Sequence, residues 1–539
     1  MKAPVSRTLF ELLDEQSQRH GDAIAVIASD VATSYAGLAA RVRQVAVALQ
    51  AQNIQRGDRV GILVSNCREW LEVCFGAGGA GGVAVPISTW STRQELEFIL
   101  ADSGVVFLFA LARFGERDYA ADLAALAPGI VAGGLCPQFP ALRQIILIQP
   151  RDNDPFTKYP DFLAAGHGHD LIPGSQAQPG DDGLILYTSG SSAKPKAVRL
   201  TQSGIIENGF SIGERQGLQP GDRMLLSPPL FWSYGSANAM PATLTHGAAL
   251  VLQEKFGAAE SLGLIERHGC TALYTLPGMT NAILLDPGFS RERVKTLRTG
   301  LTIGSAHDVR QAAESLGAAE ICNIYGATET YGNCCVTWHH WPLAQRMQCQ
   351  GPPLPGNQLR FVDGETGEAV PKGAAGLTEV AGYITPGYTG ASAVQNALIF
   401  TPDGFYRTGD IGRLDDDGNF VFIGRNTEMI KRAGINVSPA EVEDVLLRHP
   451  KIEQAGVVGV PDAGRGELII AFVVASCDAV VTSAELVEHC RSVASKYKIP
   501  DRIEICSELP LTPTGKLQRR NLKQVAIALV ALGQGGRNG

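Results

Sequence analysis

The stretch YTSGSSAKPKAVRLT, residues 187–201, places a turn rich in hydroxyls and lysines between two apolar segments. Its candidate phosphate-binding groups are hydroxyls and ammonium groups, which can donate to phosphate oxygens: Thr188, Ser189, Ser191, Ser192, Lys194 and Lys196. A Walker loop needs a glycine before its lysine and a hydroxyl after it, whereas Pro195 precedes Lys196 and Ala197 follows it. Taken alone, the stretch fits a phosphate-binding loop or a solvated polar turn.

The N-terminal half around this stretch alternates helix and strand patterns. A helix is expected after Thr8, with Glu11 completing a capping box. A second helix is expected to carry one apolar face, made of Leu38, Val42, Val45 and Leu49. Strands are expected over 58–66, 81–88 and 104–110, with helices over 68–78 and 94–103. This alternation predicts parallel sheets covered by helices.

The glycine run GAGGAGG at 76–82 suggests a place where a helix end packs closely on a strand. It also resembles a dinucleotide-binding loop in composition. That interpretation is disfavoured, because the run follows a helix pattern and the fingerprint must follow a strand.

A different pattern begins near residue 403. The segment 403–425 contains hairpin signals, including DDDG at 415–418. Beyond it, helices are expected over 440–450 and 483–499 and strands over 454–462 and 467–476. A chain of 539 residues is too long for one core, so we expect two domains, 1–426 and 427–539, the second being small and α+β.

Composition excludes several classes of protein. The net charge of −8 comes with no basic stripe carrying interleaved aromatic residues, so nucleic acid is not an expected partner. The first residues lack the apolar core of a signal peptide, and no apolar run is long enough to cross a bilayer. The 11 cysteines, without CxxC pairs, are expected to be reduced core thiols of a cytoplasmic protein. The pairs Cys334–Cys335 and His339–His340 are expected to be structural.

Two further segments carry groups suited to a nucleotide. In NIYGATETYG, residues 323–332, Glu329 follows a strand-like run and can hold Mg²⁺, while Tyr325 can offer a flat face to a purine. In YRTGD, residues 406–410, the carboxylate of Asp410 can accept from the two ribose hydroxyls. Each alone also fits a purely structural role.

Two more segments follow in the C-terminal part. GRNTEMIKRAGINVSPAEVE, residues 424–443, supplies Arg425 and a glycine-containing loop. LPLTPTGKLQRRNL, residues 509–522, presents Lys516 in a turn. An ordered set of five such segments is much more specific than any one of them.

With these motifs the chain resembles the superfamily of adenylate-forming enzymes, which includes acyl- and aryl-CoA synthetases, nonribosomal peptide adenylation domains and firefly luciferase. YTSGSSAKPKAV resembles its phosphate loop, YGATE its magnesium and nucleotide motif, and YRTGD its ribose motif. The segment 424–443 resembles its hinge region and PTGK its catalytic-lysine motif. The resemblance extends from TLFELL over nearly the whole chain.

The resemblance implies two half-reactions: a carboxylate attacks the α-phosphate of ATP, and a thiol, usually coenzyme A, then displaces AMP. It implies that ATP, Mg²⁺ and coenzyme A take part. The implied catalytic residues are Lys516, Glu329, which also holds the metal, and Thr188. The implied cofactor-binding residues are Thr188, Ser189, Ser191, Ser192 and Lys196 for the phosphates, Thr328 for the α-phosphate, Gly304, Ser305, Ala306, Tyr325 and Gly326 for the nucleotide base, Asp410 and Arg425 for the ribose, and Lys431 and Gly434 for pantetheine.

The implied fold is α/β: a large N-terminal domain of helix-covered sheets plus a β-subdomain, and a small mobile α+β C-terminal domain that rotates between half-reactions. The hinge falls at Thr427, where many members carry Asp or Lys. A hinge mainly needs permissive torsions, so rotation is expected to survive. In the phosphate loop, Ala193 and Ala197 replace glycines. Alanine at 193 removes no phosphate ligand, so Ala193→Gly is expected to leave activity within a few-fold of its starting value.

The acyl pocket is implied to lie beside the segment 227–240, SPPLFWSYGSANAM, where Trp232 replaces a common histidine and suggests an apolar gate. The implied wall residues are Trp232, Tyr234, Gly235, Asn238, Thr302, Ala327 and Tyr331. Plain core packing is the alternative role of Trp232. No aspartate is placed to hold a substrate amine, so fatty, alicyclic, steroid-derived or aromatic acids are favoured. The expected protein is an acid–CoA ligase and a homodimer; the alternatives are a carrier-loading adenylating enzyme and an impaired ATP-binding homologue.

Overall fold

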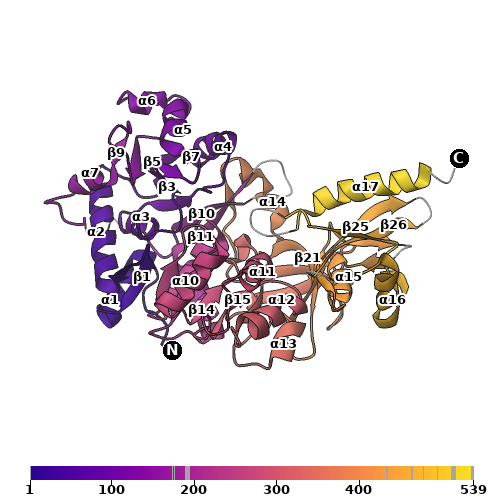
Figure 1. Cartoon of the computed structure of the whole chain (residues 1–539). Coiled ribbons are helices and arrows are strands. Elements are labelled where there is room, and N and C mark those ends of the chain that lie inside the picture. Colours follow the sequence, from indigo (N-terminus) through magenta and orange to yellow (C-terminus); the bar gives the residue numbers. More distant parts are fainter. Residues whose placement is uncertain are drawn as a thin grey trace.

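A computed structural model describes residues 2–172, 174, 176–188, 195–432, 435–462, 465–476, 479–494, 496–511 and 517–535. Figure 1 shows the N-terminal elements gathered on one side and the C-terminal elements, from α15 onward, on the other. Two sheets of eight strands form the framework of the N-terminal part.

The first of these sheets has the strand order β17-β16-β15-β14-β12-β13-β1-β2. Its strands are β1 (Ile24–Ala28), β2 (Val31–Ser34), β12 (Arg223–Leu226), β13 (Ala249–Leu252), β14 (Ala272–Tyr274), β15 (Thr299–Thr302), β16 (Cys322–Tyr325) and β17 (Cys335–Val336). All neighbours from β16 to β1 are parallel. The carboxyl ends of β12–β16 therefore meet at one edge.

The second sheet has the order β20-β11-β10-β4-β3-β5-β8-β9. Its strands are β3 (Arg59–Leu63), β4 (Val83–Pro86), β5 (Val105–Leu111), β8 (Gln144–Ile148), β9 (Thr157–Lys158), β10 (Asp182–Thr188), β11 (Lys196–Thr201) and β20 (Tyr388–Thr389). Strands β10, β4, β3, β5, β8 and β9 run parallel, and β11 and β20 are antiparallel additions. A small ribbon, β6 (Arg113–Phe114) with β7 (Arg117–Asp118), lies outside both sheets.

Strand residues that alternate between two cores show how these sheets are layered. In β5, Phe107 and Phe109 face one buried cluster, and Leu108 and Ala110 face another. The first cluster lies between the two sheets, because it also contains residues of β12, β13 and β14 together with helices packed between the sheets. These helices are α1 (Leu9–His20), α2 (Tyr35–Ala51), α3 (Arg68–Gly79), α8 (Gln202–Gln216) and α9 (Met240–Thr245). The side chains of a strand alternate between its two faces, so both faces of each sheet are covered.

Further helices cover the outer faces. On the second sheet they are α4 (Arg93–Ser103) and α5 (Tyr119–Leu126), which contribute to the other cluster, and α6 (Pro128–Val131), whose Ile130 packs against it. Helix α7 (Tyr159–Ala164) instead contributes Tyr159 and Phe162 to the cluster between the sheets. On the first sheet they are α10 (Ala258–His268), α11 (Pro277–Leu285), α12 (Ala306–Arg310) and the π-helix η2 (Gln311–Leu316). Two short helical segments follow strands of the first sheet: the π-helix η1 (Tyr234–Ala239) comes after β12, and the 3₁₀ helix η3 (Thr328–Thr330) comes after β16. Helix α13 (Leu343–Gln348) follows β17.

Residues 358–425 form an antiparallel sheet of four strands, β18 (Gln358–Val362), β19 (Gly376–Ala381), β21 (Tyr406–Leu414) and β22 (Phe420–Arg425). The short helices η4 (Gly390–Gln395) and α14 (Asn396–Ile399) lie in its β19–β21 connection. The expected DDDG hairpin is confirmed: β21 and β22 pair antiparallel across it, and Asp415 N–H donates to the Asn419 carbonyl.

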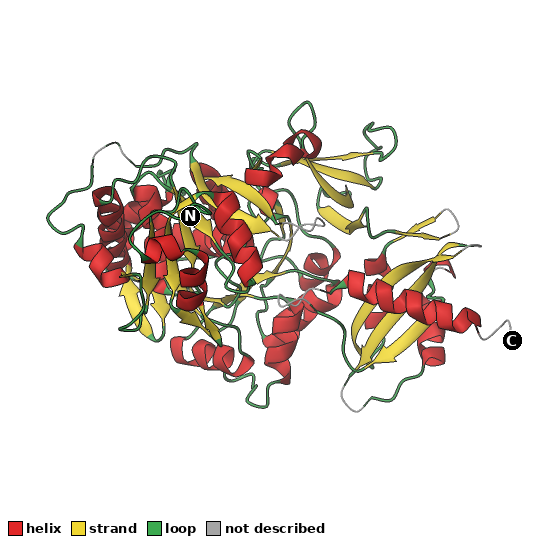
Figure 2. Cartoon of the chain, turned by 90° about the horizontal axis from the view of Figure 1, so that it is seen from above, coloured by secondary structure: helices red, strands yellow, loops and turns green. Residues whose placement is uncertain are grey.

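The C-terminal part has its own sheet, of β23 (Ile430–Arg432), β24 (Ile435–Val437), β25 (Ile452–Asp462), β26 (Gly466–Ala475) and β27 (Arg502–Cys506). Helices α15 (Pro439–Leu447) and α16 (Ser483–Val493) contribute to one cluster on this sheet, and α17 (Arg519–Gly535) to another. The short η5 (Lys496–Lys498) precedes β27. Figure 2 shows this sheet with its helices apart from the larger N-terminal mass.

The predicted α/β fold, with a large N-terminal and a smaller C-terminal part, is confirmed. The helices expected after Thr8 and around Leu38 are α1 and α2, and the Thr8 hydroxyl accepts from Glu11 N–H. The described cysteines are free, and all except half-buried Cys506 are buried. Among the helices described here, none is long and apolar enough to cross a membrane.

The glycines of the 76–82 run allow close packing of two kinds. A Cβ at Gly82 would lie 3.1 Å from the carbonyl oxygen of Asp58, just before β3, and 3.3 Å from that of Ala77 near the end of α3, as expected for a helix end close to a strand. A Cβ at Gly76 would lie 2.7 Å from Val45 of α2, and one at Gly79 would lie 2.4 Å from Phe10 of α1. The glycines let three helices approach one another, because a side chain at either position would collide with a neighbouring helix.

Candidate active site

Predicted nucleotide and acyl residues lie where strands end. Thr188 ends β10, Thr302 ends β15 and Tyr325 ends β16. Open parallel sheets bind ligands at the carboxyl ends of their strands. The structure therefore brings motifs separated by more than a hundred residues to one edge of the framework.

Thr188 and Lys196 flank the predicted phosphate loop. They face each other as register partners in the antiparallel pair β10–β11. The loop residues Ser189, Ser191, Ser192, Ala193 and Lys194 lie outside the described residues. The pairing of the two strands therefore holds Thr188 and Lys196 close to each other.

Tyr388 links the phosphate side of the site to the predicted metal ligand. Lys196 Nζ lies 5.3 Å from the centroid of the Tyr388 ring, and the Tyr388 hydroxyl donates to Glu329 Oε1 at 2.7 Å. Burial, followed by the Glu329 carboxylate, raises the pKa of Tyr388, so the phenol remains a donor. Sequence reasoning missed this residue, because β20 reaches the site only by pairing with β11.

The loop that carries Thr328 and Glu329 is shaped by close backbone packing. A Cβ at Gly326 would lie 2.4 Å from the Gly332 carbonyl oxygen, so glycine is required at 326. The Thr328 hydroxyl lies 3.0 Å from that of Ser233, which belongs to the segment 227–240 predicted to line the acyl pocket. The α-phosphate candidate is therefore fixed next to the acyl candidates.

Tyr325, Asp410 and Arg425, which are predicted to bind the base and the ribose, form a second cluster. The Tyr325 hydroxyl donates to Asp410 Oδ2 at 2.8 Å, and one face of its ring packs on Phe420 with centroids 4.2 Å apart. Arg425 Nε lies 3.1 Å from Asp410 Oδ1, close enough for an ion pair although that oxygen has no hydrogen bond of good geometry. Burial raises the pKa of Asp410, with Arg425 acting in the opposite direction.

Asp410 gives a prediction about stability and pH. A carboxyl whose pKa is raised on folding stabilises the fold below its unfolded pKa of about 3.9 and loses that contribution as the pH rises through the folded value. We expect Asp410→Asn to be more stable than the parent near pH 7, with a difference that shrinks toward about pH 4. Arg425 is largely exposed, so losing its ion pair costs little. Urea denaturation across pH would check this; a pH-independent difference would refute it.

The predicted base-binding segment begins at Gly304, which has a φ of +155°, a backbone angle that glycine adopts more readily than other residues. Ser305 caps α12, and Ala306 is its first residue. Asp308 Oδ2 accepts from the Ser305 backbone N–H at 2.7 Å and from its hydroxyl at 2.8 Å. This capping box holds the segment in place, and burial raises the pKa of Asp308. The spacing of Ser305 and Asp308 was visible in the sequence as a capping signal, but it was not used.

The predicted acyl-side residues divide into two groups. Gly235 and Asn238 lie in η1, Thr302 and Ala327 lie at the neighbouring sheet edge, and Trp232 precedes η1. A Cβ at Gly235 would lie 2.4 Å from the Pro229 carbonyl oxygen, which requires glycine there.

The two predicted tyrosines of the acyl pocket are anchored in the core by their hydroxyls. Tyr234 donates to the carbonyls of Thr275 and Leu301 at 3.2 and 3.0 Å. The Tyr331 hydroxyl lies 2.9 Å from that of Thr201, and its ring faces Gly204 of α8. Gly332, next in sequence, is the residue that lies against Asn238. The structure thus assigns Tyr331 a core position, with its backbone on the loop.

A cavity of about 360 Å³ lies near Trp232, although Trp232 and the other predicted acyl residues do not line it. Its lining is mainly apolar but includes Glu254 and Lys255. The Trp232 ring is perpendicular to that of Trp90 at 5.0 Å, and Trp90 and Phe231 line the cavity. Other apolar lining residues are Phe114, Phe256, Met279 and Leu511, the last from the C-terminal part. Trp90 was not predicted, because nothing local marks the residue after β4 as part of a site.

The C-terminal candidates are only partly placed. Gly434 and Lys516 lie outside the described residues, whereas Leu511 and Leu517, on either side of Lys516, form a β-bridge. Lys431 is exposed in β23, where its backbone N–H donates to Glu467, and it is not brought to the nucleotide cluster. Leu511, the last described residue before Lys516, lines a cavity whose other lining residues belong to the N-terminal part.

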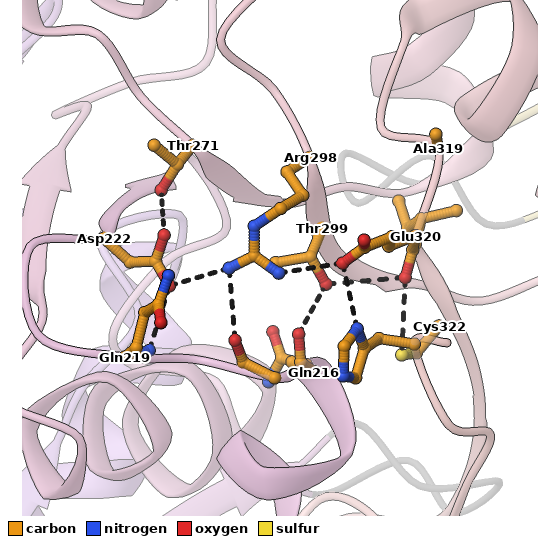
Figure 3. A network of polar contacts seen from close by, with 12 residues as sticks. Gln216, Gln219, Asp222, Thr271, Arg298, Thr299, Ala319, Glu320 and Cys322 are labelled. Atoms are coloured by element: carbon orange, nitrogen blue, oxygen red, sulfur yellow. Dashed lines mark hydrogen bonds and ion pairs between the residues drawn. The ribbon is translucent and has the colours of Figure 1, made fainter. Parts of the chain in front are cut away.

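The histidine pair has a structural setting. His339 Nδ1 lies 2.9 Å from Glu320 Oε2, which also accepts from Arg298. Arg298 donates in addition to Asp222 at 2.8 Å. Figure 3 shows that these polar contacts join the residues just before the starts of β12, β15 and β16. Within the described part of the chain, no group of three or more metal-binding side chains is found.

Comparison with known proteins gives two family matches. The model for AMP-binding enzymes matches residues 13–389, and the model for the C-terminal domain of AMP-binding enzymes matches 441–516. Acyl-CoA ligase SID4 of Ajellomyces capsulatus is 31% identical over 548 residues, covering 97% of this chain and 92% of that protein. The mitochondrial medium-chain acyl-CoA ligase ACSF2 of Mus musculus is 29% identical over 546 residues, with 96% and 88% covered.

Solved structures agree with this fold. The anthranilate CoA ligase AuaEII in complex with anthranoyl-AMP superposes with a TM-score of 0.85 at 26% identity, covering 98% of this chain and all of that one. ATP-bound MatB from Rhodopseudomonas palustris gives 0.83 at 25% identity, with 97% and 100% covered.

Proposed function

This chain belongs to the AMP-binding enzyme family and is an AMP-forming acid–CoA ligase, and we propose that its substrate is a carboxylic acid with a mainly hydrophobic skeleton. The observation that supports the substrate class is the mainly apolar cavity near Trp232, lined by Trp90, Phe231, Phe256 and Met279 together with the charged Glu254 and Lys255. Aromatic side chains of this size bury much apolar surface when a ligand covers them. Fatty, alicyclic, steroid-derived and aromatic acids all present such surface.

The residues divide the first half-reaction between them. The acid's carboxylate oxygen attacks the α-phosphorus of ATP, and the bond to the bridging oxygen breaks, which releases pyrophosphate and leaves an acyl-adenylate. Thr188 and Lys196 would hold the β- and γ-phosphates, Thr328 the α-phosphate, and Lys516 would neutralise the attacking carboxylate. Because both reactants are anions, positioning and charge neutralisation supply most of the catalysis. In the second half-reaction the coenzyme A thiolate attacks the acyl carbon, and AMP leaves.

Mg²⁺ fits the donor set at Glu329. A hard cation of this kind is usually held by one or two carboxylates together with substrate phosphates and water. Glu329 offers one carboxylate, oriented through Oε1 by Tyr388, next to the Thr328 hydroxyl. When bound, the ion would neutralise phosphate charge as pyrophosphate separates.

Asp410, Arg425 and Tyr325 would bind the nucleoside. The Asp410 carboxylate has one oxygen engaged by Tyr325 and the other near Arg425, in a position to accept from ribose hydroxyls. The 304–306 segment, held by Asp308, would lie against the base. Domain rotation about Thr427 would bring the segment around Lys431 and Gly434 to the site for thioester formation.

A panel of acids tests the proposal. Purified protein is given ATP, Mg²⁺ and pooled fatty, alicyclic, steroidal and aromatic acids, with acetate and malonate added, with and without coenzyme A. We expect matched amounts of AMP and one or more hydrophobic acyl-CoA products. Each buried methylene contributes about 0.8 kcal/mol, so a six-carbon acid, with four more methylenes, should exceed acetate by about 200-fold in kcat/KM.

Other results would point elsewhere. If acetate or malonate is the best substrate, the hydrophobic assignment is wrong. AMP formation that ignores coenzyme A and needs a carrier protein would indicate a carrier-loading enzyme. ATP binding without AMP from any acid would indicate an impaired homologue, and Ala193→Gly would then be the variant to measure.

A further inference from the structure

Three fully buried polar side chains near the acyl candidates carry atoms without a hydrogen-bond partner among the described residues. These atoms are Asn238 Nδ2, Thr302 Oγ1, and both Asn333 Nδ2 and Oδ1. The three residues are 0%, 0% and 0% exposed, respectively. Buried polar groups are nearly always paired, and one left unpaired is costly. Such a cluster points to a ligand group that supplies the missing partner.

The order of donors and acceptors fixes how Asn238 is oriented. Gln216 Nε2 lies 3.3 Å from the Ile212 carbonyl oxygen and 3.0 Å from the Tyr274 hydroxyl. A carbonyl only accepts, so the Gln216 atom beside it must be the amide nitrogen. The Tyr274 hydroxyl then accepts from Gln216 and gives its own proton to Asn238 Oδ1, at 3.2 Å. Asn238 therefore presents its NH₂ group on the opposite side.

Further contacts hold the hydrogen-bonded chain Gln216–Tyr274–Asn238 in place. The Thr299 hydroxyl donates to the Gln216 carbonyl at 2.8 Å, as Figure 3 shows. Arg298, one residue earlier, joins Asp222 and Glu320 with contacts of 2.8 Å. Burial raises the pKa of Tyr274 well above its ordinary value, which keeps its proton on the phenol. Because the Asn238 NH₂ group is held in one orientation, it can donate a hydrogen bond to a ligand atom at one defined position.

The free NH₂ group of Asn238 faces the loop that carries the α-phosphate candidate. A Cβ at Gly332 would lie only 2.8 Å from Asn238 Nδ2. Gly332 N–H donates to the Ala327 carbonyl, and Ala327 precedes Thr328. Asn333 follows directly, with its Cα 2.5 Å from the position of a Cβ on Gly326. Asn238 and Asn333 therefore lie against the 326–332 loop, which carries Thr328, the residue proposed to hold the α-phosphate.

We propose that the acid carries a neutral oxygen, a hydroxyl or an oxo group, that accepts a hydrogen bond from Asn238 Nδ2 and is read further by Asn333. This inference rests on the proposed function, because it specifies the acid for the same site. An amide NH₂ group can only donate, so an amine is not a partner for it. Asn238 is contacted by Tyr274 and Gly332, which are both uncharged. An uncharged environment favours a neutral oxygen over a second carboxylate as the ligand group.

Matched pairs of acids test the proposal. Each pair has one carbon skeleton, with and without a single hydroxyl or oxo oxygen, and the oxygen is moved along the skeleton from pair to pair. For the wild-type enzyme we expect one position of the oxygen to raise kcat/KM by about 10-fold or more over the parent acid. Comparing a hydroxyl acid with an oxo acid that carries its oxygen at the same carbon shows which of the two groups is the acceptor.

The substitution Asn238→Leu removes the donor while keeping a similar volume. We expect the ratio of kcat/KM for the oxygenated acid to that for its parent to fall to about one or below. A general loss of folded enzyme lowers both members of a pair equally, so it leaves the ratio unchanged. The control is Ser103→Ala in α4. Ser103 also has a buried polar atom without a hydrogen-bond partner among the described residues, and its replacement should leave the ratio of the two kcat/KM values at the wild-type level.

The outcomes are separable. If the wild type turns over parent acids as well as every oxygenated analogue, the amides are satisfied by water and this inference is wrong, although the acid–CoA ligase assignment stands. A wild-type preference that Asn238→Leu retains also overturns it. Failure of the proposed function has a different signature, the absence of AMP from every acid of both kinds.

Discussion

Glu329→Gln is expected to lower the rate of acyl-adenylate formation by about 100-fold or more, and to raise the Mg²⁺ concentration needed for half-maximal activity. Glutamine keeps an oxygen that can accept from Tyr388, so the loop geometry should survive while the negative charge is lost. ATP–pyrophosphate exchange measured across a Mg²⁺ titration would show both effects.

Tyr388→Phe is the matched control for this prediction. It deletes the hydrogen bond to Glu329 Oε1 but leaves the carboxylate charge, and a net hydrogen bond is worth about 0.5–1.5 kcal/mol, or roughly 2- to 12-fold. Equal losses in the two variants, or an unchanged Mg²⁺ requirement in Glu329→Gln, would show that Glu329 orients the loop and does not hold the ion.

Lys516→Ala is expected to lower adenylate formation by about 100- to 1,000-fold, because it removes the positive charge that we propose neutralises the attacking carboxylate. The second half-reaction should be largely spared, since its nucleophile is the coenzyme A thiolate. Stopped-flow or quench-flow measurement of each half-reaction separates the two, with prepared acyl-adenylate as the substrate for the second.

Lys523→Ala serves as the control, because this half-exposed lysine of α17 pairs with Glu467 at 3.3 Å and has no part in the proposed chemistry. Its rates should match those of the parent. If Lys516→Ala slows thioester formation as much as adenylation, its role lies in domain closure or stability and not in the first chemical step.

Much of the fold could be predicted because its signals are local. The strand patterns that became β3, β4 and β5 alternate with helix patterns over a few residues, and β5 is apolar on both faces because both faces are covered. The DDDG turn requires a positive φ at Gly418, which glycine adopts freely, so the hairpin was readable from four residues. The motif order likewise indicated the nucleotide cluster around Tyr325, Glu329 and Asp410.

The sequence by itself determined the order of elements, the family resemblance and most of the candidate nucleotide residues, because periodicity, capping and turn chemistry act over a few neighbouring residues. Only the tertiary structure decided which distant groups meet. Tyr388 reaches Glu329 from a strand 59 residues later, and Trp90 reaches Trp232 from the other sheet. The glycines at 76 and 79 face helices, a choice that depends on which neighbour approaches. The orientation of Asn238 depends on Tyr274 and Gln216, since a hydrogen bond's direction is set by all its partners together.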